Sequence, residues 1–393
     1  MGLFVPSIRR RNSEGIVMDI SFSFEELEIQ KAVRKFVRND ILPIYREMDE
    51  KGELPEEIKK QFLSMGLLRS IFPEAYGGVD GSFTGLVIAL KELSYASLVP
   101  SWVVFENFML AYPLLHYGSE FLKTTYLPGL ISLDTLGALA FTADDTGSDP
   151  AQLKTVAKKA DGGWIINGSK RFITHSGICD HMIIFTKTGD NTTAFLVESK
   201  KKGYKVGKRE TFVHTKAVDN GDVYFEDYFA PDDHVIGKVG QGFEILLRTE
   251  AIGKIAFSSL FVGVGQRAID LSLNYARTRT HRGSPIGHKF QMTQVKLARM
   301  MTKLNAMNAY LYQVCAKVDR GEDIFLDGAA LKLLVANDIK EITSDAMEIH
   351  GAYGLSEEYD VANLYRVAII AQVVMGSLDI QRVITARGML GNA

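Results

Sequence analysis

The 393-residue chain contains little cysteine and no long apolar run. Its two cysteines, Cys179 and Cys315, stand far apart without a CxxC spacing, which excludes a disulfide framework and leaves a metal site without support. No segment reaches the ~18 uninterrupted apolar residues of a membrane span. Residues 1–18 also lack the apolar core of a signal peptide. We therefore expect a cytoplasmic protein whose folded body follows a flexible extension over residues 1–18.

The chain also lacks a strong charge of either sign and a dinucleotide-binding motif. Its formal net charge is −2, and it has no basic domain or interleaved basic and aromatic surface, so nucleic acid is not expected as a partner. No GxGxxG follows a predicted strand and opens a helix, so a Rossmann site has no support. A hydrophobic content of 46% with 23% charged residues is typical of a soluble globular protein.

Hydrophobic periodicity divides the chain into three parts. Amphipathic helical runs dominate residues 19–134, and short β-rich pieces separated by Asn and Gly follow over residues 135–241. The helical period returns over residues 242–393 with three apolar stripes. These stripes lie within residues 260–275, 297–318 and 331–349. The pattern predicts an α+β protein with an N-terminal helical domain, a middle antiparallel β-domain and a C-terminal four-helix bundle.

The segments with the most specific patterns resemble one enzyme family. Residues 363–391, NLYRVAIIAQVVMGSLDIQRVITARGMLG, resemble the closing segment of acyl-CoA dehydrogenases, which commonly reads LYRDARxxxIxEGTSEIQRxxIAxxLLG. Residues 66–78, GLLRSIFPEAYGG, resemble the family's GLLGIxxPEEYGG. The resemblance covers nearly all of the chain from residue 20 onward. It implies the acyl-CoA dehydrogenase fold, FAD as cofactor and an acyl-CoA thioester as substrate.

Two further segments resemble the flavin-binding motifs of that family. Residues 139–149, LAFTADDTGSD, resemble YxxTEPxAGSD, with Ala143 and Asp144 in place of Glu and Pro. Residues 168–174, GSKRFIT, resemble GxKxWITN, in which the aromatic residue covers the flavin and the Thr bonds near its reactive nitrogen. Each feature alone has a structural explanation, but their order and spacing favour an FAD site. The residues implied are Leu139, Phe141, Thr142, Gly147, Ser148, Phe172, Ile173 and Thr174, of which Ser148 also approaches the acyl-CoA.

The resemblance implies a second group of FAD contacts, most of them supplied by a neighbouring subunit. Arg279 matches the Arg of RxxFGxPI, whose guanidinium suits a pyrophosphate. Glu348 stands where QxxGGxG is usual, and a carboxylate there is unfavourable unless it is protonated or turned away. The residues implied are Arg279, Gln291, Glu348, Gly351, Ala352, Ser377 and Asp379. A homo-oligomer, a dimer or a tetramer with shared FAD sites, follows from the same resemblance.

The catalytic glutamate of the family is absent from both of its usual positions. Met375 replaces the Glu of EGT, and a thioether cannot act as a base. Some family members place the Glu thirteen residues before the Gln of GxxQ, and Gly253 occupies that position relative to Gln266. A general base typically contributes ~10²–10⁴-fold to the rate, so desaturation needs a carboxylate from elsewhere.

Glu250 is the carboxylate nearest to the second base position in the sequence. It precedes Gly253 by three residues, or ~4.5 Å along a helix, on roughly the same face. The alternative interpretation is a solvated residue in the first turn of a helix. The substrate-binding residues implied by the resemblance are Ser148, Lys254, Met375 and Gly376.

Three functions fit these patterns. The first is an FAD-dependent acyl-CoA dehydrogenase, or a reductase running the same chemistry, with Glu250 as base and an electron-transfer flavoprotein as partner. The second is a lyase of the desulfinase type that acts on a CoA thioester without net oxidation, because the backbone N–H of Met375 can still polarise the thioester carbonyl. The third is a non-catalytic flavin-binding or acyl-CoA-binding member. More of the family's flavin-binding residues are present in this chain than we would expect at a site that no longer functions, which favours the first function.

Overall fold

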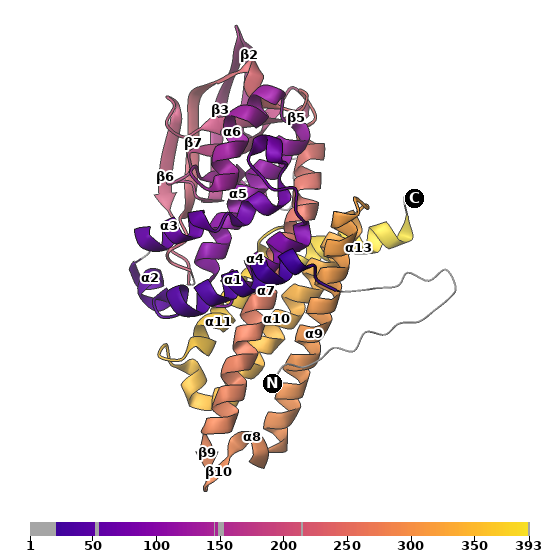
Figure 1. Cartoon of the computed structure of the whole chain (residues 1–393). Coiled ribbons are helices and arrows are strands. Elements are labelled where there is room, and N and C mark those ends of the chain that lie inside the picture. Colours follow the sequence, from indigo (N-terminus) through magenta and orange to yellow (C-terminus); the bar gives the residue numbers. More distant parts are fainter. Residues whose placement is uncertain (1–20, 52–54, 145, 148–152, 214, 392–393) are drawn as a thin grey trace, which may run out of the picture.

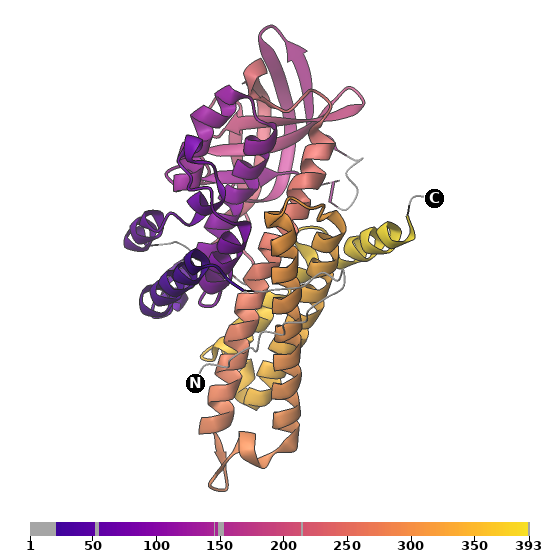
Figure 2. The same ribbon diagram turned by 45° about the vertical axis from the view of Figure 1, so that its right-hand side comes forward.

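The order of elements follows the predicted pattern of helices, strands and helices. The computed structural model describes residues 21–51, 55–144, 146–147, 153–213 and 215–391. The sheet lies at one end of an elongated molecule, and the helical bundle extends from it to a tip at the other end (Figure 1). The N-terminal helices cover one side of the sheet and continue onto the bundle (Figure 2).

The N-terminal part consists of helices that begin at polar capping residues. Ser23 caps α1 in a capping box with Glu26, which satisfies backbone N–H groups at the helix start. Ser82, Ser97 and Ser119 cap three later helices, each by accepting one backbone N–H of the first turn with its side chain. The elements are α1 (Phe24–Phe36), a π-helical turn (Val37–Ile41), α2 (Tyr45–Lys51), α3 (Glu56–Ser64), η2 (Leu67–Ile71), η3 (Glu74–Tyr76), α4 (Phe83–Ser94), α5 (Leu98–Tyr117) and α6 (Glu120–Ser132).

The middle part is a twisted sheet with strand order β6-β7-β3-β2-β4-β5-β8, and β1 pairs with β4. The pairs are antiparallel as predicted, except that β1 and β2 pair with β4 in parallel. Parallel pairing is possible because β2 and β3 intervene between β1 and β4, which gives the chain room to cross over. The strands are β1 (Gly137–Ala140), β2 (Val156–Ala160), β3 (Gly163–Thr174), β4 (His181–Thr188), β5 (Asn191–Glu198), β6 (Tyr204–Arg209), β7 (Asn220–Pro231) and β8 (Val235–Ile236), with η5 (Asp232–His234) before β8.

The C-terminal part is a bundle built on three long helices. Helix α7 has 37 residues and is about 55 Å long, so it runs from the sheet to the far tip of the molecule. The predicted apolar stripes lie on α7, α9 and α10 and contribute to the main core. The elements are α7 (Gly242–Thr278), β9 (Thr280–His281), β10 (Ser284–Pro285), α8 (Ile286–Lys289), α9 (Gln291–Asp319), α10 (Phe325–His350), η6 (Gly351–Leu355), α11 (Asp360–Ala368), α12 (Ile370–Val373) and α13 (Leu378–Leu390).

Helix α5 lies at the centre of the contacts between the three parts. It packs against α4, α6, α7 and β1, and a single hydrophobic core joins the N-terminal helices to the bundle. It is long and apolar enough to cross a membrane, but 83% of its most apolar window is buried inside the protein, as in the core helix of a globular domain. The bent pair formed by residues 360–373 and α13 passes the same test of length and composition.

The domain limits proposed from the sequence, 19–134, 135–241 and 242–393, stay a prediction. The change from helix to strand falls between Ser132 and Gly137, and the change back falls between Ile236 and Gly242. Residues 1–18, expected to be a flexible extension, lie outside the described residues.

Candidate functional site

The two predicted flavin-binding segments lie side by side at the ends of β1 and β3. The backbone N–H of Arg171 donates to the carbonyl of Thr142 at 2.8 Å. Lys170 reinforces this junction, since its buried Nζ donates to the carbonyl of Phe141 at 3.0 Å and to that of Phe185 at 2.7 Å. Burial lowers the pKa of Lys170 to about 7, so these carbonyls hold an ammonium group that is close to losing its charge.

Phe172 is turned out of the sheet by an irregularity in β3. The register between β3 and β7 shifts between Lys170 and Ile173, which is the signature of a bulge that re-aims a side chain. Phe172 has a φ of +56°, a sparsely populated conformation for a bulky residue, and it leaves 49% of its surface exposed. Ile173 is buried in the core of the sheet, so only its backbone is available to a ligand.

The residues present fit a flavin. The half-exposed ring of Phe172 offers a flat apolar face, and the half-buried residues Thr142 and Thr174 of the same two segments carry hydroxyl groups. Thr174 Oγ1 accepts from Asn220 Nδ2 at 3.2 Å, while the buried Asn220 Oδ1 has no hydrogen-bond partner among the described residues. Among the described residues other than its chain neighbours, no atom lies within 4 Å of the point where a Cβ atom would stand on Gly147. Ser148, the remaining predicted contact, lies outside the described residues.

The remaining members of this first predicted group lie on β1 and just after it. The side chains of Leu139 and Phe141 are partly buried and pack against the main core. Phe141 meets Phe185 edge to face at 6.1 Å between ring centroids. Their packing fixes the end of β1, from which the backbone continues to Thr142.

The two vacated base positions meet in space. A Cβ atom built on Gly253 would lie 2.8 Å from Met375 Cε and 2.6 Å from the sulfur of Met109 on α5. Met375 has a left-handed backbone with φ of +58°. Gln381 Nε2 donates to the carbonyl of Met375 at 3.3 Å, and Lys332 Nζ donates to the carbonyl of Gly376. Three apolar positions therefore fill the place where a carboxylate is expected.

Glu250 is paired with a buried lysine. Its Oε2 lies 3.5 Å from Lys254 Nζ, and Lys254 is almost fully buried whereas the Glu250 side chain is 27% exposed. Burial first, and then the neighbouring Lys254, lowers the pKa of Lys332 to about 7. Glu250 therefore offsets positive charge at this point, and its role as a base stays a prediction.

A buried carboxyl group that the sequence patterns did not single out lies on α5. The indole Nε1 of Trp102 donates to Glu106 Oε1 at 3.2 Å. Burial raises the pKa of Glu106 to about 8, while hydrogen bonds from Trp102, the Leu139 backbone and the Thr174 hydroxyl act in the opposite direction. The signal in the sequence is a carboxylate within the apolar run SWVVFENFML, which the helical period alone does not distinguish from a surface residue.

Asn107, the neighbour of Glu106, ties α5 to the start of β1. Its Oδ1 accepts from the Gly137 backbone N–H at 2.8 Å, and its Nδ2 donates to the carbonyls of Leu130 and Thr135 at 2.8 Å each. Its polar groups satisfy buried backbone atoms where α6 leads into β1. The position of Glu106 relative to β1 is therefore fixed by the adjacent residue.

Five of the seven residues in the second predicted group of FAD contacts lie at the far tip of the bundle, whereas Ser377 and Asp379 lie at the start of α13. Arg279 ends α7 with its guanidinium 6.0 Å from the ring of Tyr353. Glu348 Oε2 lies 2.5 Å from Lys296 Nζ, and this cation lowers the pKa of Glu348, so its charge is locally balanced. The 26 residues between Gly253 and Arg279 correspond to about 39 Å along α7, so one chain holds the two groups apart (Figure 1).

The other predicted FAD contacts have defined local roles. Gln291 opens α9, and Gly351 has a positive φ of 63° and is followed by the exposed Ala352 in η6. Ser377 caps α13 by accepting from the backbone N–H of Ile380. Asp379 is exposed and pairs with Arg382 at 2.6 Å. Figures 1 and 2 show α13 projecting from the side of the bundle.

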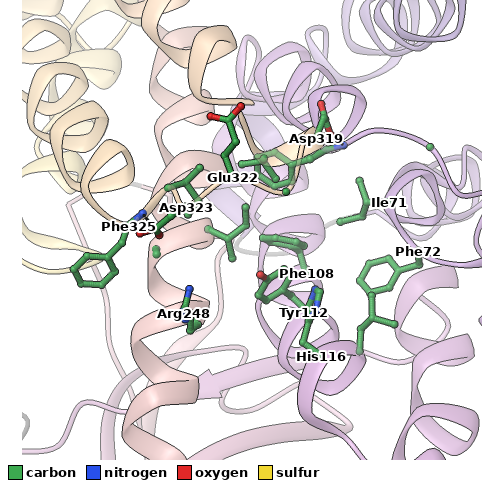
Figure 3. A pocket seen from close by; sticks show the side chains of 18 residues that line it. Ile71, Phe72, Phe108, Tyr112, His116, Arg248, Asp319, Glu322, Asp323 and Phe325 are labelled. Carbon is green, nitrogen blue, oxygen red and sulfur yellow. Dashed lines mark hydrogen bonds between the residues drawn. The ribbon is translucent and has the colours of Figure 1, made fainter. Parts of the chain in front are cut away.

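A separate cavity of about 450 Å³ lies between α5, α7 and the segment that joins α9 to α10. Figure 3 shows the rings of Phe108 and Tyr112 at its centre, between Arg248 on one side and Ile71 with Phe72 on the other. Its α5 wall is formed by Phe108, Tyr112, Leu115 and His116 and does not include Glu106 or Met109. Within the part of the chain that the structure describes, no three His, Cys, Asp or Glu side chains gather in a way that could hold a metal ion.

Comparisons with protein-family models assign nearly the whole chain to one family. Residues 23–134 match the N-terminal domain of acyl-CoA dehydrogenases, residues 138–228 match the middle domain, and residues 240–390 match the C-terminal domain. A 3-(aryl)acrylate reductase of Clostridium sporogenes is 32% identical over 92% of this chain and 97% of its own length. An acyl-CoA dehydrogenase of Bacillus subtilis is 31% identical over 93% of this chain and 98% of its own.

Solved structures agree with these matches. Butyryl-CoA dehydrogenase of Megasphaera elsdenii has a TM-score of 0.93 and 29% identity, covering 95% of this chain and 100% of its own. A chain of a structure described as the electron transferring flavoprotein of Acidaminococcus fermentans has a TM-score of 0.93 and 27% identity, covering 95% and 100%. PigA with FAD and proline has a TM-score of 0.90 and 27% identity, covering 95% and 99%.

The comparisons confirm the predicted fold, FAD as cofactor and the oxidoreductase class. The curated relatives named here are a dehydrogenase and a reductase, which does not favour the lyase or the non-catalytic alternative. The binding or catalytic role of each site residue is not tested by these matches and stays a prediction. The chain belongs to the acyl-CoA dehydrogenase family of flavoenzymes.

Proposed function

We propose that the protein is an FAD-dependent oxidoreductase that introduces or removes an α,β double bond in the acyl group of a CoA thioester. The observation that carries this proposal is the link that helix α5 makes between two surfaces. One consists of Phe172, Thr142 and Thr174 and fits a flavin, and the other is the apolar junction of Met375 with Gly253. Helix α5 reaches both surfaces, because Glu106 interacts with Thr174 and Met109 contacts the position of Gly253.

The residues of the first surface hold and orient the cofactor. Phe172 would pack against the flavin ring, and the hydroxyls of Thr142 and Thr174 would offer it hydrogen bonds. Lys170 keeps the backbone of Phe141 in place from inside the sheet. FAD supplies a two-electron acceptor or donor for the acyl chain when it is bound.

The residues of the second surface bind and polarise the thioester. The backbone N–H of Met375 is directed by a loop whose carbonyls are held by Gln381 and Lys332. Such a fixed donor stabilises negative charge on a thioester oxygen without any contribution from the side chain. The side chains of Met375 and Met109 make the site apolar, which excludes water from the reacting carbons.

A complete FAD site in this proposal requires a second copy of the chain. Arg279, Gln291, Glu348, Gly351 and Ala352 lie at the tip of the bundle and would bind the pyrophosphate and adenine of FAD on the partner. A homodimer is the smallest assembly that completes the site, and a tetramer is the family's usual arrangement. We also propose a cytoplasmic location. We further propose an electron-transfer flavoprotein as redox partner, and the likeness to the Acidaminococcus structure supports this partner.

The direction of the reaction is decided by the spectrum of the purified protein. Butyryl-CoA and 3-phenylpropanoyl-CoA should bleach the oxidised flavin if the enzyme desaturates. The corresponding enoyl-CoA esters should reoxidise the dithionite-reduced flavin if the enzyme reduces, as the clostridial relative's name suggests. A colourless protein, or a yellow protein whose spectrum responds to none of these thioesters in either redox state, would contradict the proposed function.

A further inference from the structure

The face of α5 that carries Met109 also carries a buried carboxyl group. Glu106 and Met109 are three residues apart, a spacing that makes side chains neighbours on a helix surface. Met109 reaches Gly253 on α7, whereas Glu106 interacts with the backbone of Leu139 and the hydroxyl of Thr174. Glu106 therefore stands between the two vacated base positions and the predicted flavin contacts.

We propose that Glu106 is the carboxyl group that exchanges a proton with the bound acyl group, in place of the glutamate that Met375 and Gly253 lack. This inference rests on the proposed function, because the thioester has to bind between α5, α7 and the loop at residue 375. The carboxyl group is held in one orientation by the indole of Trp102, whose ring packs edge to face on Phe257 of α7 at 6.0 Å between centroids. Glu106 belongs to α5, whereas the two usual base positions belong to α7 and to the loop before α13. It would therefore occupy a similar place in the site although it comes from a different part of the sequence.

The surroundings of Glu106 suit a group that both gives and takes a proton. Its pKa of about 8 results from burial and three hydrogen bonds, without a contribution from a charged side chain of the described residues. The titratable neighbour of Thr174 on β3 is His175, which is buried against the Gly137 carbonyl and has its pKa lowered by burial. His175 is therefore neutral near pH 7. A proton-transfer group with a pKa near the working pH is efficient in both directions.

The proton on Glu106 also decides where the hydroxyl hydrogen of Thr174 points. Asn220 Nδ2 already donates to Thr174 Oγ1, so the hydroxyl donates its own hydrogen to another acceptor. Ionised Glu106 accepts this hydrogen bond from the Thr174 hydroxyl. Protonated Glu106 can instead donate to Oγ1, which frees the Thr174 hydrogen for an acceptor on the cofactor. Protonation of Glu106 thus makes the predicted Thr174 donor available to the flavin.

The proposed proton exchange needs no oxidant. A carboxylate oxygen of Glu106 takes a proton from a C–H bond that is activated by the thioester, so the C–H bond breaks and an O–H bond forms. The electron pair stays in the acyl group as an enolate, whose oxygen is stabilised by the Met375 N–H. In D₂O the carboxyl group exchanges with solvent and returns a deuteron to the same carbon.

The test is deuterium uptake by butyryl-CoA and 3-phenylpropanoyl-CoA in D₂O, measured by mass spectrometry on the holoenzyme without an electron acceptor. We expect exchange with the unmodified protein and a loss of at least about 100-fold in Glu106→Gln. The absorbance change of the flavin on acyl-CoA binding should persist in that variant. Glu106→Asp should retain slow exchange. Trp102→Phe removes a donor that favours the carboxylate, so the pH midpoint of exchange should move upward.

Two carboxyl variants serve as comparisons. Glu92→Gln changes a buried carboxyl group on α4 that is paired with Arg34, away from the site, and should leave exchange unchanged. Glu250→Gln tests the rival carboxyl. Exchange that is lost in Glu250→Gln and kept in Glu106→Gln would overturn the proposal. A protein that binds acyl-CoA but exchanges no deuterium would also overturn it, whereas a protein that holds no flavin and binds no acyl-CoA would overturn the proposed function instead.

A second readout needs neither substrate nor cofactor. Folded Glu106 keeps its proton up to about pH 8, whereas an unfolded glutamate loses it near its ordinary value of 4.5. As the pH rises from about 4.5 to about 8, the free energy of unfolding of the apoprotein should therefore fall more steeply in the unmodified protein than in Glu106→Gln. Parallel pH profiles of the two proteins would show that Glu106 is not a buried protonated carboxyl group, and the proposal would fail.

Discussion

The terminal methyl of Met375 lies 2.8 Å from the point where a Cβ atom would stand on Gly253. Two positions that are far apart in the sequence thus share one volume of the site. A carboxylate at position 253 would require Met375 and Met109 to move, whereas a carboxylate at position 375 faces a residue without a side chain. Both contacts of Gly253 are to the ends of flexible methionine side chains, so that volume can be redistributed at small cost.

Met375→Glu should restore a base at the position given by the resemblance. The carboxylate would enter the space next to Gly253, where no Cβ blocks it, and in a Glu106→Gln background, which lacks the proposed base, proton removal should accelerate by roughly 10²–10⁴-fold. Stopped-flow bleaching of the flavin by butyryl-CoA measures the gain. Met375→Gln has the same shape without the carboxylate and should show no gain. An inert Met375→Glu protein that still binds the thioester would indicate that the pocket holds the acyl group elsewhere.

Glu250→Gln should destabilise the protein through Lys254. Glu250 is the ion-pair partner of a buried ammonium group at 3.5 Å, and loss of a partner to a buried charged group costs roughly 1–3 kcal/mol. Urea unfolding of the apoprotein measures the change in the free energy of unfolding. Glu244→Gln, an exposed change on the same helix, should have little effect. Equal stability of the two variants would show that the Glu250 to Lys254 pair contributes nothing.

Phe172 should control the affinity for FAD while contributing little to stability. The Phe172 side chain is half exposed, and its backbone has a positive φ. Phe172→Ala therefore removes the stacking face without opening a cavity in the core. The Kd for FAD, from fluorescence titration of the apoprotein, should rise about five- to tenfold, in line with aromatic stacking worth about 1–1.4 kcal/mol. Phe172→Trp should keep the affinity. An unchanged Kd in Phe172→Ala would place the flavin elsewhere.

Lys170 should make stability depend on pH in the alkaline range. Its folded pKa of about 7 lies below the ordinary 10.5, so the unfolded chain binds one more proton between these values. The free energy of unfolding should therefore rise with pH across this window, by up to about 1.4 kcal/mol per pH unit, relative to Lys170→Met. Lys158→Met, an exposed change on β2, is the matched control. A profile of Lys170→Met that parallels the unmodified protein would contradict a buried, uncharged Lys170.

Arg279 should act on the FAD site of another chain. Arg279→Ala and Phe172→Ala should each release FAD when purified alone, because each lacks one half of every site. In oligomers refolded from an equal mixture, a site that combines the intact tip of one chain with the intact sheet surface of the other should recover bound FAD. Flavin absorbance after gel filtration measures the recovery. No recovery in a mixed oligomer would place both groups in the same chain's site.

Local patterns were enough to predict most of the fold. The strands around Trp164, His181 and Thr193 alternate with turns, and the structure forms β3, β4 and β5 there. Period and capping depend on neighbouring residues, so they can be read along the chain. The parallel pairing of β1 with β4 could not be predicted from local patterns, because it depends on how β2 and β3, which lie between them in the sequence, are placed in the folded sheet.

The site divides in the same way. Thr142, Phe172 and Thr174 were identified from short motifs, and the absence of a base at Met375 and Gly253 was evident from substitutions within them. Glu106 was not identified, because its significance depends on burial and on contacts with Leu139 and Thr174 from other elements. The balancing of Glu348 by Lys296 likewise joins two helices, α9 and α10.

The sequence by itself determined the family, the flavin and the loss of the usual glutamate, since these are properties of residue type and spacing. Only the tertiary structure decided that the two empty base positions touch and that a buried carboxyl group lies one helical turn along α5 from Met109, which contacts the Gly253 position. A pKa near 8 for that carboxyl group is set by the removal of water around Glu106, and burial exists only after the helices and the sheet have packed together.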